Sequence, residues 1–112
     1  MTNKYESLRI EYQDLFSEHF WGFECGEGWY DLIRLLLETI KQENTDTKVT
    51  QIKEKFGALR FYVTSASPLI YAVINYAENL STTICDICGD KGALIISDYG
   101  WHKTRCYKHK ED

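Results

Sequence analysis

The chain has 112 residues, a length that suits one domain. Its hydrophobic fraction of 44% is ordinary for a globular protein and excludes disordered, collagen-like and low-complexity classes. The net charge of −4 does not favour nucleic acid as the main partner, because proteins that grip phosphate backbones are usually basic; a local basic face stays open.

The first residues show no apolar run of signal-peptide type, and no stretch approaches the roughly 18 apolar residues that would cross a membrane. We therefore expect a cytoplasmic protein without a membrane segment. Thiols stay reduced in that compartment, so the four cysteines indicate metal binding or reactivity rather than disulfides.

Two helices are expected in the first half of the chain. Residues 4–20 carry apolar side chains at spacings of three and four, which predicts one helix: Tyr5, Leu8, Tyr12, Leu15, Phe16 and Phe20. Three glycines within residues 22–28 interrupt it. A second helix over about 28–43 has its own apolar stripe: Trp29, Leu32, Ile33, Leu36, Leu37 and Ile40.

Residues 48–64 are rich in β-branched and aromatic residues and predict a hairpin, with strands 48–55 and 58–64 around a turn near Gly57. Alternation in the second strand places one face on the helices and the other in solvent. Ser67 and Pro68 are typical of an N-cap and a first helical position, so a third helix is expected over about 68–83.

Four residues near the C-terminus show the spacing of a zinc site: Cys85, Cys88, Cys106 and His109. Zinc prefers four tetrahedral sulfur or nitrogen ligands in structural sites, and a two-residue gap turns both thiolates of a pair inward. With four good ligands the site is closed, so we expect one structural zinc ion rather than a catalytic one. Two alternatives remain: a redox-active Cys85–Cys88 pair, although such pairs begin a helix, and four unrelated thiols beside a solvent-exposed histidine.

The order of elements around these cysteines resembles a treble-clef zinc finger: a knuckle at Cys85–Cys88, a hairpin and a short helix beginning at Cys106. The hairpin has strands 93–96 and 101–105 around a turn at 97–100. A zinc ribbon, with a second knuckle in place of the helix, is the alternative. The expected fold class is therefore α+β. Residues 1–84 form three amphipathic helices with a hairpin, and residues 85–112 form a zinc module packed on them in one domain.

Cys25 is the cysteine outside the zinc pattern and lies just ahead of the second helix, between Glu24 and Glu27. A helix N-terminus can lower a thiol pKa, but no nucleophile signature surrounds this residue. The interpretations are a structural thiol, a reactive thiol or an auxiliary metal contact. The two glutamates are an acid–base pair or, more commonly, carboxylates that favour the helix dipole.

Two groups of residues are candidates for partner binding. The first is a basic-aromatic patch on the solvent face of the central hairpin: Lys53, Lys55, Arg60 and Tyr62. A solvated strand face with protective lysines is its alternative. The second is a basic cluster in the zinc module, of which Trp101 and Arg105 are the candidate contacts. We expect Trp101 to cover the zinc hairpin.

Three segments together resemble a family of small uncharacterised proteins from bacteria and their phages: Gly22 to Leu32, Gln51 to Tyr62 and the Cys/His tail. The resemblance implies no catalytic residues, because no activity is established for that family. It does imply a phage or mobile-element origin. We expect a non-enzymatic, zinc-stabilised inhibitor or adaptor that binds another protein. A nucleic-acid-binding zinc finger is the first alternative, and an enzyme centred on Cys25 is the second.

Overall fold

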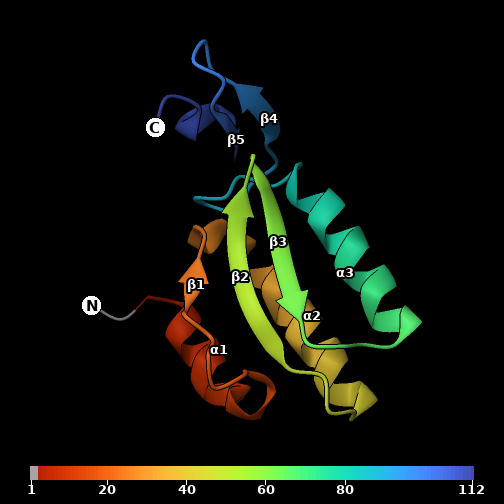
Figure 1. The fold of residues 1–112 in the computed structure, drawn as a ribbon. Coiled ribbons are helices and arrows are strands. Elements are labelled where there is room, and N and C mark those ends of the chain that lie inside the picture. Colours follow the sequence, from red (N-terminus) through yellow and green to blue (C-terminus); the bar gives the residue numbers. More distant parts are fainter. Residues whose placement is uncertain (1–2) are drawn as a thin grey trace.

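The computed structural model describes residues 3–112, and its fold class is α+β, as predicted (Figure 1). The helices are α1 (Tyr5–Glu11), α2 (Tyr30–Glu43) and α3 (Pro68–Ser81), and the strands are β1 (Phe23–Glu24), β2 (Val49–Lys55), β3 (Ala58–Val63), β4 (Ala93–Ile96) and β5 (His102–Arg105). Single 3₁₀ turns cover Gln13–Leu15, Glu27–Trp29 and Tyr107–His109. Within the described residues, no helix is both long and apolar enough to cross a membrane.

The larger sheet has the order β1-β2-β3, in which β1 runs parallel and β3 antiparallel to β2. One cross-strand row faces the helices and consists of Phe23, Ile52 and Phe61. The neighbouring row, which consists of Glu24, Lys53 and Arg60, points the other way because side chains alternate along a strand. The helices lie against one face of this sheet, so the second face remains open, as the alternation in the hairpin predicted (Figure 1).

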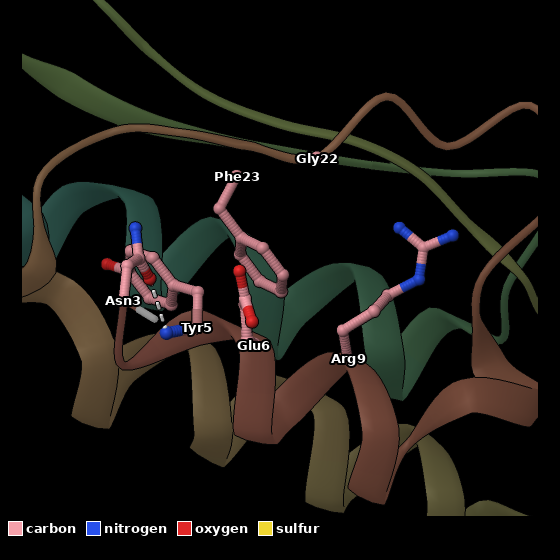
Figure 2. A pocket seen from close by; sticks show the side chains of 6 residues that line it. All are labelled: Asn3, Tyr5, Glu6, Arg9, Gly22 and Phe23. Carbon is pink, nitrogen blue, oxygen red and sulfur yellow. Dashed lines mark hydrogen bonds between the residues drawn. The ribbon is translucent and has the colours of Figure 1, made fainter. Parts of the chain in front are cut away.

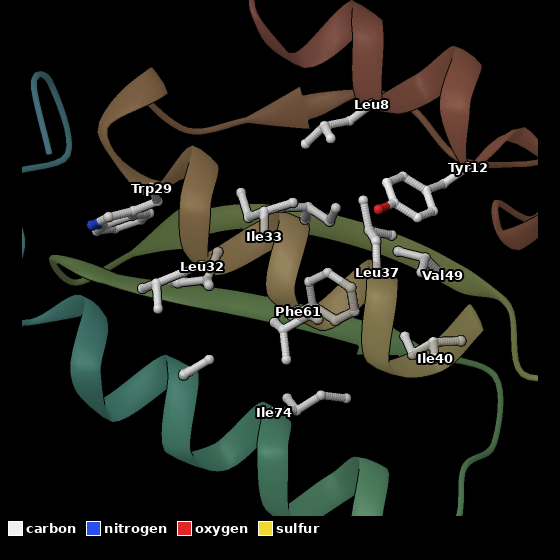
Figure 3. Packing of buried hydrophobic residues seen from close by; sticks show 14 of the residues in the cluster. Leu8, Tyr12, Trp29, Leu32, Ile33, Leu37, Ile40, Val49, Phe61 and Ile74 are labelled. Atoms are coloured by element: carbon white, nitrogen blue, oxygen red, sulfur yellow. The ribbon is translucent and has the colours of Figure 1, made fainter. Parts of the chain in front are cut away.

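Helix α2 is the centre of the hydrophobic core, with α1 and α3 on either side of it (Figure 3). Its predicted stripe is buried in full: Leu32, Ile33, Leu36, Leu37 and Ile40. Trp29, at the start of the helix, is completely buried. Burying one such large side chain contributes about 1.5–3 kcal/mol, so this stripe is a main source of stability.

The first helix is shorter than the predicted 4–20. It ends at Glu11, a 3₁₀ turn follows, and Phe16 is already extended with φ −90° and ψ 137°. There Phe16 forms a β-bridge with Val49, and Ser17 donates its N–H to the Val49 carbonyl at 2.9 Å. Apolar residues continue at helix-like spacing beyond the end of α1 because Phe16 and Phe20 pack against each other and against Phe23. Tertiary packing, rather than helix periodicity, explains that spacing. Strand β1 was not predicted.

The free edge of β3 is closed by side chains of α3. The Leu59 N–H donates to Ser81 Oγ and the Phe61 N–H to Glu78 Oε2, each at 2.9 Å. The helix itself starts as predicted, because Ser67 Oγ accepts the Ile70 N–H at 3.2 Å and Pro68 occupies the first helical position. An unpaired strand edge invites another strand, and here two of its donors are already used.

Candidate metal centre

The Cys85–Cys88 segment forms a tight knuckle. The Cys85 carbonyl accepts the Gly89 N–H at 2.9 Å, and Cys88 Sγ accepts the Asp90 N–H at 3.5 Å. Gly89 has φ +87°, a conformation that residues with a Cβ rarely adopt. The chain therefore reverses directly after the second cysteine, which turns both sulfur atoms to one side.

The second pair of candidate ligands arrives at the end of the β4–β5 hairpin, whose strands match the predicted 93–96 and, after Trp101, 102–105. Cys106 follows β5 directly. A 3₁₀ turn over Tyr107–His109 then places the histidine beside it, with the His109 N–H donating to the Cys106 carbonyl at 3.1 Å. The expected short terminal helix is thus a single 3₁₀ turn.

The four donor atoms gather at one point: all lie within 4.8 Å of one another. Cys88 Sγ is 3.6 Å from Cys106 Sγ, and His109 Nδ1 is 3.6 Å from Cys85 Sγ and 3.2 Å from Cys106 Sγ. A zinc tetrahedron with Zn–S bonds of about 2.3 Å has S···S edges of roughly 3.7 Å. The four side chains could therefore hold one metal ion, with the histidine binding through Nδ1.

The electrostatics of the cluster favour a cation at its centre. Burial raises the pKa of the Cys85 thiol, but the N–H groups of Cys88, Cys106 and Ile87, together with His109, outweigh burial and lower it to about 6. The Asp90 N–H lowers the pKa of Cys88, whereas partial burial and the neighbouring Cys106 and Cys85 sulfurs raise it, with a net value of about 11. The first thiol therefore loses its proton readily, whereas the negative charge of its thiolate opposes deprotonation of the second. A divalent cation between the sulfur atoms would neutralise this repulsion.

An ion pair lies beside the cluster and joins its two halves. Arg105 Nε donates to Asp86 Oδ1 at 2.6 Å, and both side chains are largely buried. Burial raises the pKa of Asp86 above its ordinary value, while the Arg105 guanidinium acts in the opposite direction. Arg105 was predicted as a partner contact. The structure places it in this pair between knuckle and hairpin, and its binding role stays a prediction.

The knuckle packs on the loop that precedes α2, through close backbone contacts that the sequence did not reveal. Gly28 donates its N–H to the Asp86 carbonyl at 2.9 Å, and Trp29 Nε1 donates to the Ile84 carbonyl at 2.9 Å. A Cβ on Gly28 would stand 2.0 Å from the Cys85 carbonyl oxygen, and one on Gly26 equally close to that of Asp86. Because Gly26 and Gly28 have no Cβ, the backbone of the knuckle can lie in direct contact with this loop.

The tip of the central hairpin is the second docking point of the C-terminal module. Thr104, fully buried in β5, donates its hydroxyl to the Gly57 carbonyl at 2.6 Å. A Cβ on Gly57 would meet Leu94 Cδ1 at 2.4 Å. Residues 85–112 thus contact the rest of the chain at both the knuckle and the hairpin (Figure 1).

Cys25 belongs to the same glycine loop, directly before Gly26, and contacts Tyr5 of α1. Its thiol donates to Tyr5 Oη at 3.7 Å, and Tyr5 in turn donates to the Gly26 carbonyl. Burial, opposed by the Tyr5 hydroxyl and reinforced by nearby carboxylates, raises the pKa of Cys25 to about 11. This thiol is protonated at neutral pH, which is the opposite of an activated nucleophile.

A hollow of about 310 Å³ opens beside Tyr5, between α1 and the segment that leads into β1 (Figure 2). Arg9 is its only cationic lining residue among Asn3, Tyr5, Glu6, Arg9, Gly22 and Phe23. The Arg9 guanidinium lies over the rings of Phe16 and Phe20, 5.1 and 4.7 Å from their centroids. It supports an aromatic cluster of the core, so this hollow offers no free charged group other than Glu6.

The predicted basic-aromatic patch lies on the open face of the sheet. Lys53 is opposite Arg60, and Tyr62, which is 42% exposed, is opposite Gln51 in the next row. Lys55 is at the tip. Among the described residues, none of these cations has a carboxylate within 4.0 Å. Their placement on one face agrees with the sequence analysis, and their role in binding stays a prediction.

The sequence analysis predicted that Trp101 covers the C-terminal hairpin. This prediction is wrong, because Trp101 is 73% exposed. It belongs to a turn rather than to β5, and with Tyr99 and His102 it lines a groove of about 380 Å³ against Phe56 and Glu54. We call this the aromatic groove; its residues are Glu54, Phe56, Tyr99, Gly100, Trp101 and His102. The sequence did not indicate it, because its two sides come from turns more than forty residues apart.

Phe56 occupies a strained position in this groove. It has φ +54° and Gly57 has φ +83°, as in the two-residue turns where asparagine and glycine are preferred. A bulky side chain at positive φ costs about 1–3 kcal/mol. Phe56 is also 65% exposed, so burial does not offset this cost.

Comparisons with protein families, with curated proteins and with solved structures find no match for this chain. The resemblance to small bacterial and phage proteins therefore stays a prediction, and the candidate site rests on its own geometry.

Proposed function

We propose that this chain is a small cytoplasmic protein, stapled by one structural zinc ion, that works without catalysis by binding another protein. Zinc is the metal that three thiolates and one imidazole at tetrahedral spacing suit best. Four ligands leave no open position for water or substrate. A reducing compartment supports the assignment because the thiols must be free to bind metal.

We further propose a treble-clef-like arrangement, in which a knuckle, a hairpin and a helical turn supply the ligands in that order. The single 3₁₀ turn at His109 is shorter than a full helix, so a zinc ribbon is the alternative. A phage or mobile-element origin, with the chain as an inhibitor or adaptor of a host protein, completes the proposal.

The observation that carries the binding function is the aromatic groove. Phe56, Tyr99 and Trp101 are 65%, 91% and 73% exposed and lie together. Contiguous exposed apolar surface marks interaction sites, and tryptophan and tyrosine are the residues that contribute most to interfaces. Closure of the β3 edge supports docking by side chains rather than by strand addition.

The experiment compares capture of host proteins by the zinc-loaded wild type and by the double variant Phe56→Asn/Trp101→Ala. We expect a partner in near-stoichiometric amount with the wild type and its loss with the variant. The control is Trp21→Ala, because Trp21 is 88% exposed and lies outside the groove. Capture that depends entirely on nucleic acid, and disappears after nuclease treatment, would contradict the proposal.

Nucleic-acid binding is a second candidate, favoured by Lys53, Lys55 and Arg60 beside Tyr62, since these cations form no ion pair within residues 3–112. A cationic surface with an aromatic ring suits a single strand. It predicts salt-sensitive binding of oligonucleotides that Lys53→Glu and Arg60→Glu weaken. The net charge of −4 and the adjacent Glu24 oppose it.

A further inference from the structure

The aromatic groove combines aromatic rings with a single carboxylate. Glu54 is the only acidic or basic side chain apart from His102 among its lining residues. Glu54 Oε2 accepts the Gly57 N–H at 2.7 Å, which fixes the carboxylate and leaves Oε1 available. Among the described residues Glu54 forms no ion pair within 4.0 Å.

Two of the aromatic residues that line the groove, Phe56 and His102, pack against each other. Phe56 meets His102 edge to face, with ring centroids 5.7 Å apart. His102 Nδ1 lies 3.0 Å from the Gly100 carbonyl, which fixes the orientation of the imidazole within the turn. The Lys55 ammonium already lies 5.7 Å from the centroid of Phe56, so this ring attracts a cation in the chain itself.

Aromatic faces with an unpaired carboxylate attract cationic groups, because ring quadrupole and carboxylate charge act in the same direction. The whole chain adds to this field with its net charge of −4, and Asp98 directly precedes Tyr99 in the turn. The same charges repel phosphate. The basic residues Lys53 and Arg60 lie on the open sheet face and do not line the groove, whereas the Lys55 ammonium lies beside it, 5.7 Å from the Phe56 ring centroid, and a bound cation would have to displace it.

We propose that the aromatic groove binds an arginine- or lysine-bearing peptide segment of a partner protein, with the cation between Glu54 and the faces of Phe56 and Trp101. This inference rests on the proposed binding function and names the chemistry of the partner. It also accounts for the phenylalanine at positive φ: an asparagine would suit the turn better and would remove an anchor.

The test is an NMR titration of the full zinc-loaded chain, followed through its backbone amide signals and the indole N–H signals of its three tryptophans, so that Trp101→Ala can be measured as well. The probes are an octapeptide of alternating arginine and glycine, the same peptide with glutamate in place of arginine, and an eight-nucleotide oligothymidylate. We expect the arginine peptide to shift the Trp101 signal and to leave the buried Trp29 signal in place.

Variants separate the groove from general charge attraction. Phe56→Asn and Trp101→Ala should each weaken binding of the arginine peptide by about tenfold or more, the usual effect of losing an anchoring aromatic residue. Phe56→Asn should unfold at the same or a higher temperature than the wild type, because strain is relieved. Glu54→Gln keeps the acceptor for Gly57 and should weaken binding, whereas Glu24→Gln, on the open sheet face, should not.

Several outcomes would overturn the inference. One is no shift of Trp101 with the arginine peptide at millimolar concentration; another is a stronger shift with the glutamate peptide or the oligothymidylate. A shift that depends on the concentration of the protein alone would indicate a second copy of the chain in the groove. The capture experiment with Phe56→Asn/Trp101→Ala separates this inference from the proposed binding function. If that double variant still loses the captured host protein while the titration gives one of these outcomes, the cationic peptide is the wrong occupant and the proposed binding function stands.

Discussion

Gly28 donates its backbone N–H to the carbonyl oxygen of Asp86, 2.9 Å away, and so joins the start of the main core helix to the metal knuckle. The neighbouring Trp29 repeats the connection with its indole N–H on Ile84. The glycine-rich loop therefore packs directly against the backbone of the knuckle. The candidate metal centre and the core are therefore joined by these two hydrogen bonds.

Replacing Gly28 with alanine should separate the knuckle from the core. The added Cβ would stand 2.0 Å from the Cys85 carbonyl oxygen, and backbone atoms cannot move aside as a flexible side chain can. We expect a loss of about 1–3 kcal/mol or more in the free energy of unfolding, together with weaker metal retention. Gly100→Ala is the matched control, because a Cβ on Gly100 would meet no atom within 4 Å and only its φ of +83° is penalised. Equal stability of the two variants, measured by denaturant unfolding, would argue against the contact.

Removing the metal should loosen more than the last quarter of the chain. Structural zinc contributes about 10–16 kcal/mol apparent in small finger peptides, which exceeds the net stability of many domains. Without the ion the knuckle loses its shape, and Trp29 then loses its acceptor at Ile84. A chelator should therefore change the near-ultraviolet circular dichroism of the buried tryptophan and speed exchange of its indole proton. An unchanged Trp29 signal beside an unfolded C-terminal module would show that the two parts are independent.

Cys25 should behave as an unreactive thiol. Its pKa is raised to about 11, mainly by burial, so at pH 7.5 the thiolate is scarce. We expect alkylation by iodoacetamide roughly a hundredfold slower than for a free cysteine of ordinary pKa. Because the folded pKa is raised, this group favours the folded state below about pH 9 and ceases to do so as the pH rises towards 11. Rapid labelling of Cys25 at neutral pH, detected by peptide mass spectrometry, would instead revive the enzyme hypothesis.

The ion pair between Arg105 and Asp86 should contribute to the stability of the fold. Asp86→Ala leaves the largely buried guanidinium without its partner at 2.6 Å, and removing one member of a buried pair costs about 3–5 kcal/mol. Arg105 is not fully enclosed, so we expect the lower end of that range. Thermal unfolding of Asp86→Ala, Arg105→Ala and the double variant measures the coupling. Additive effects in this cycle would show that the pair contributes nothing as a pair.

Local chemistry made part of this structure predictable. The α2 stripe, the Ser67 cap and the two hairpins follow from periodicity and turn residues, and the cysteine spacing identified the four side chains that the structure brings together as a possible metal site. The first helix was predicted too long. The ring of Phe16 packs in the core from an extended backbone, and apolar periodicity alone cannot distinguish this from a helical turn. Backbone approach to Gly28 and the meeting of Phe56 with Trp101 depend on tertiary contacts between distant segments, for which no local pattern exists.

We propose that Cys85, Cys88, Cys106 and His109 hold one zinc ion that keeps the fold together. Native mass spectrometry with elemental analysis, on protein purified under reducing conditions, tests it directly. We expect one zinc per chain, lost in Cys106→Ser and retained in Cys25→Ser, and a change in circular dichroism on chelation. A metal content well below one per chain, with a spectrum that a chelator leaves unchanged, would contradict it.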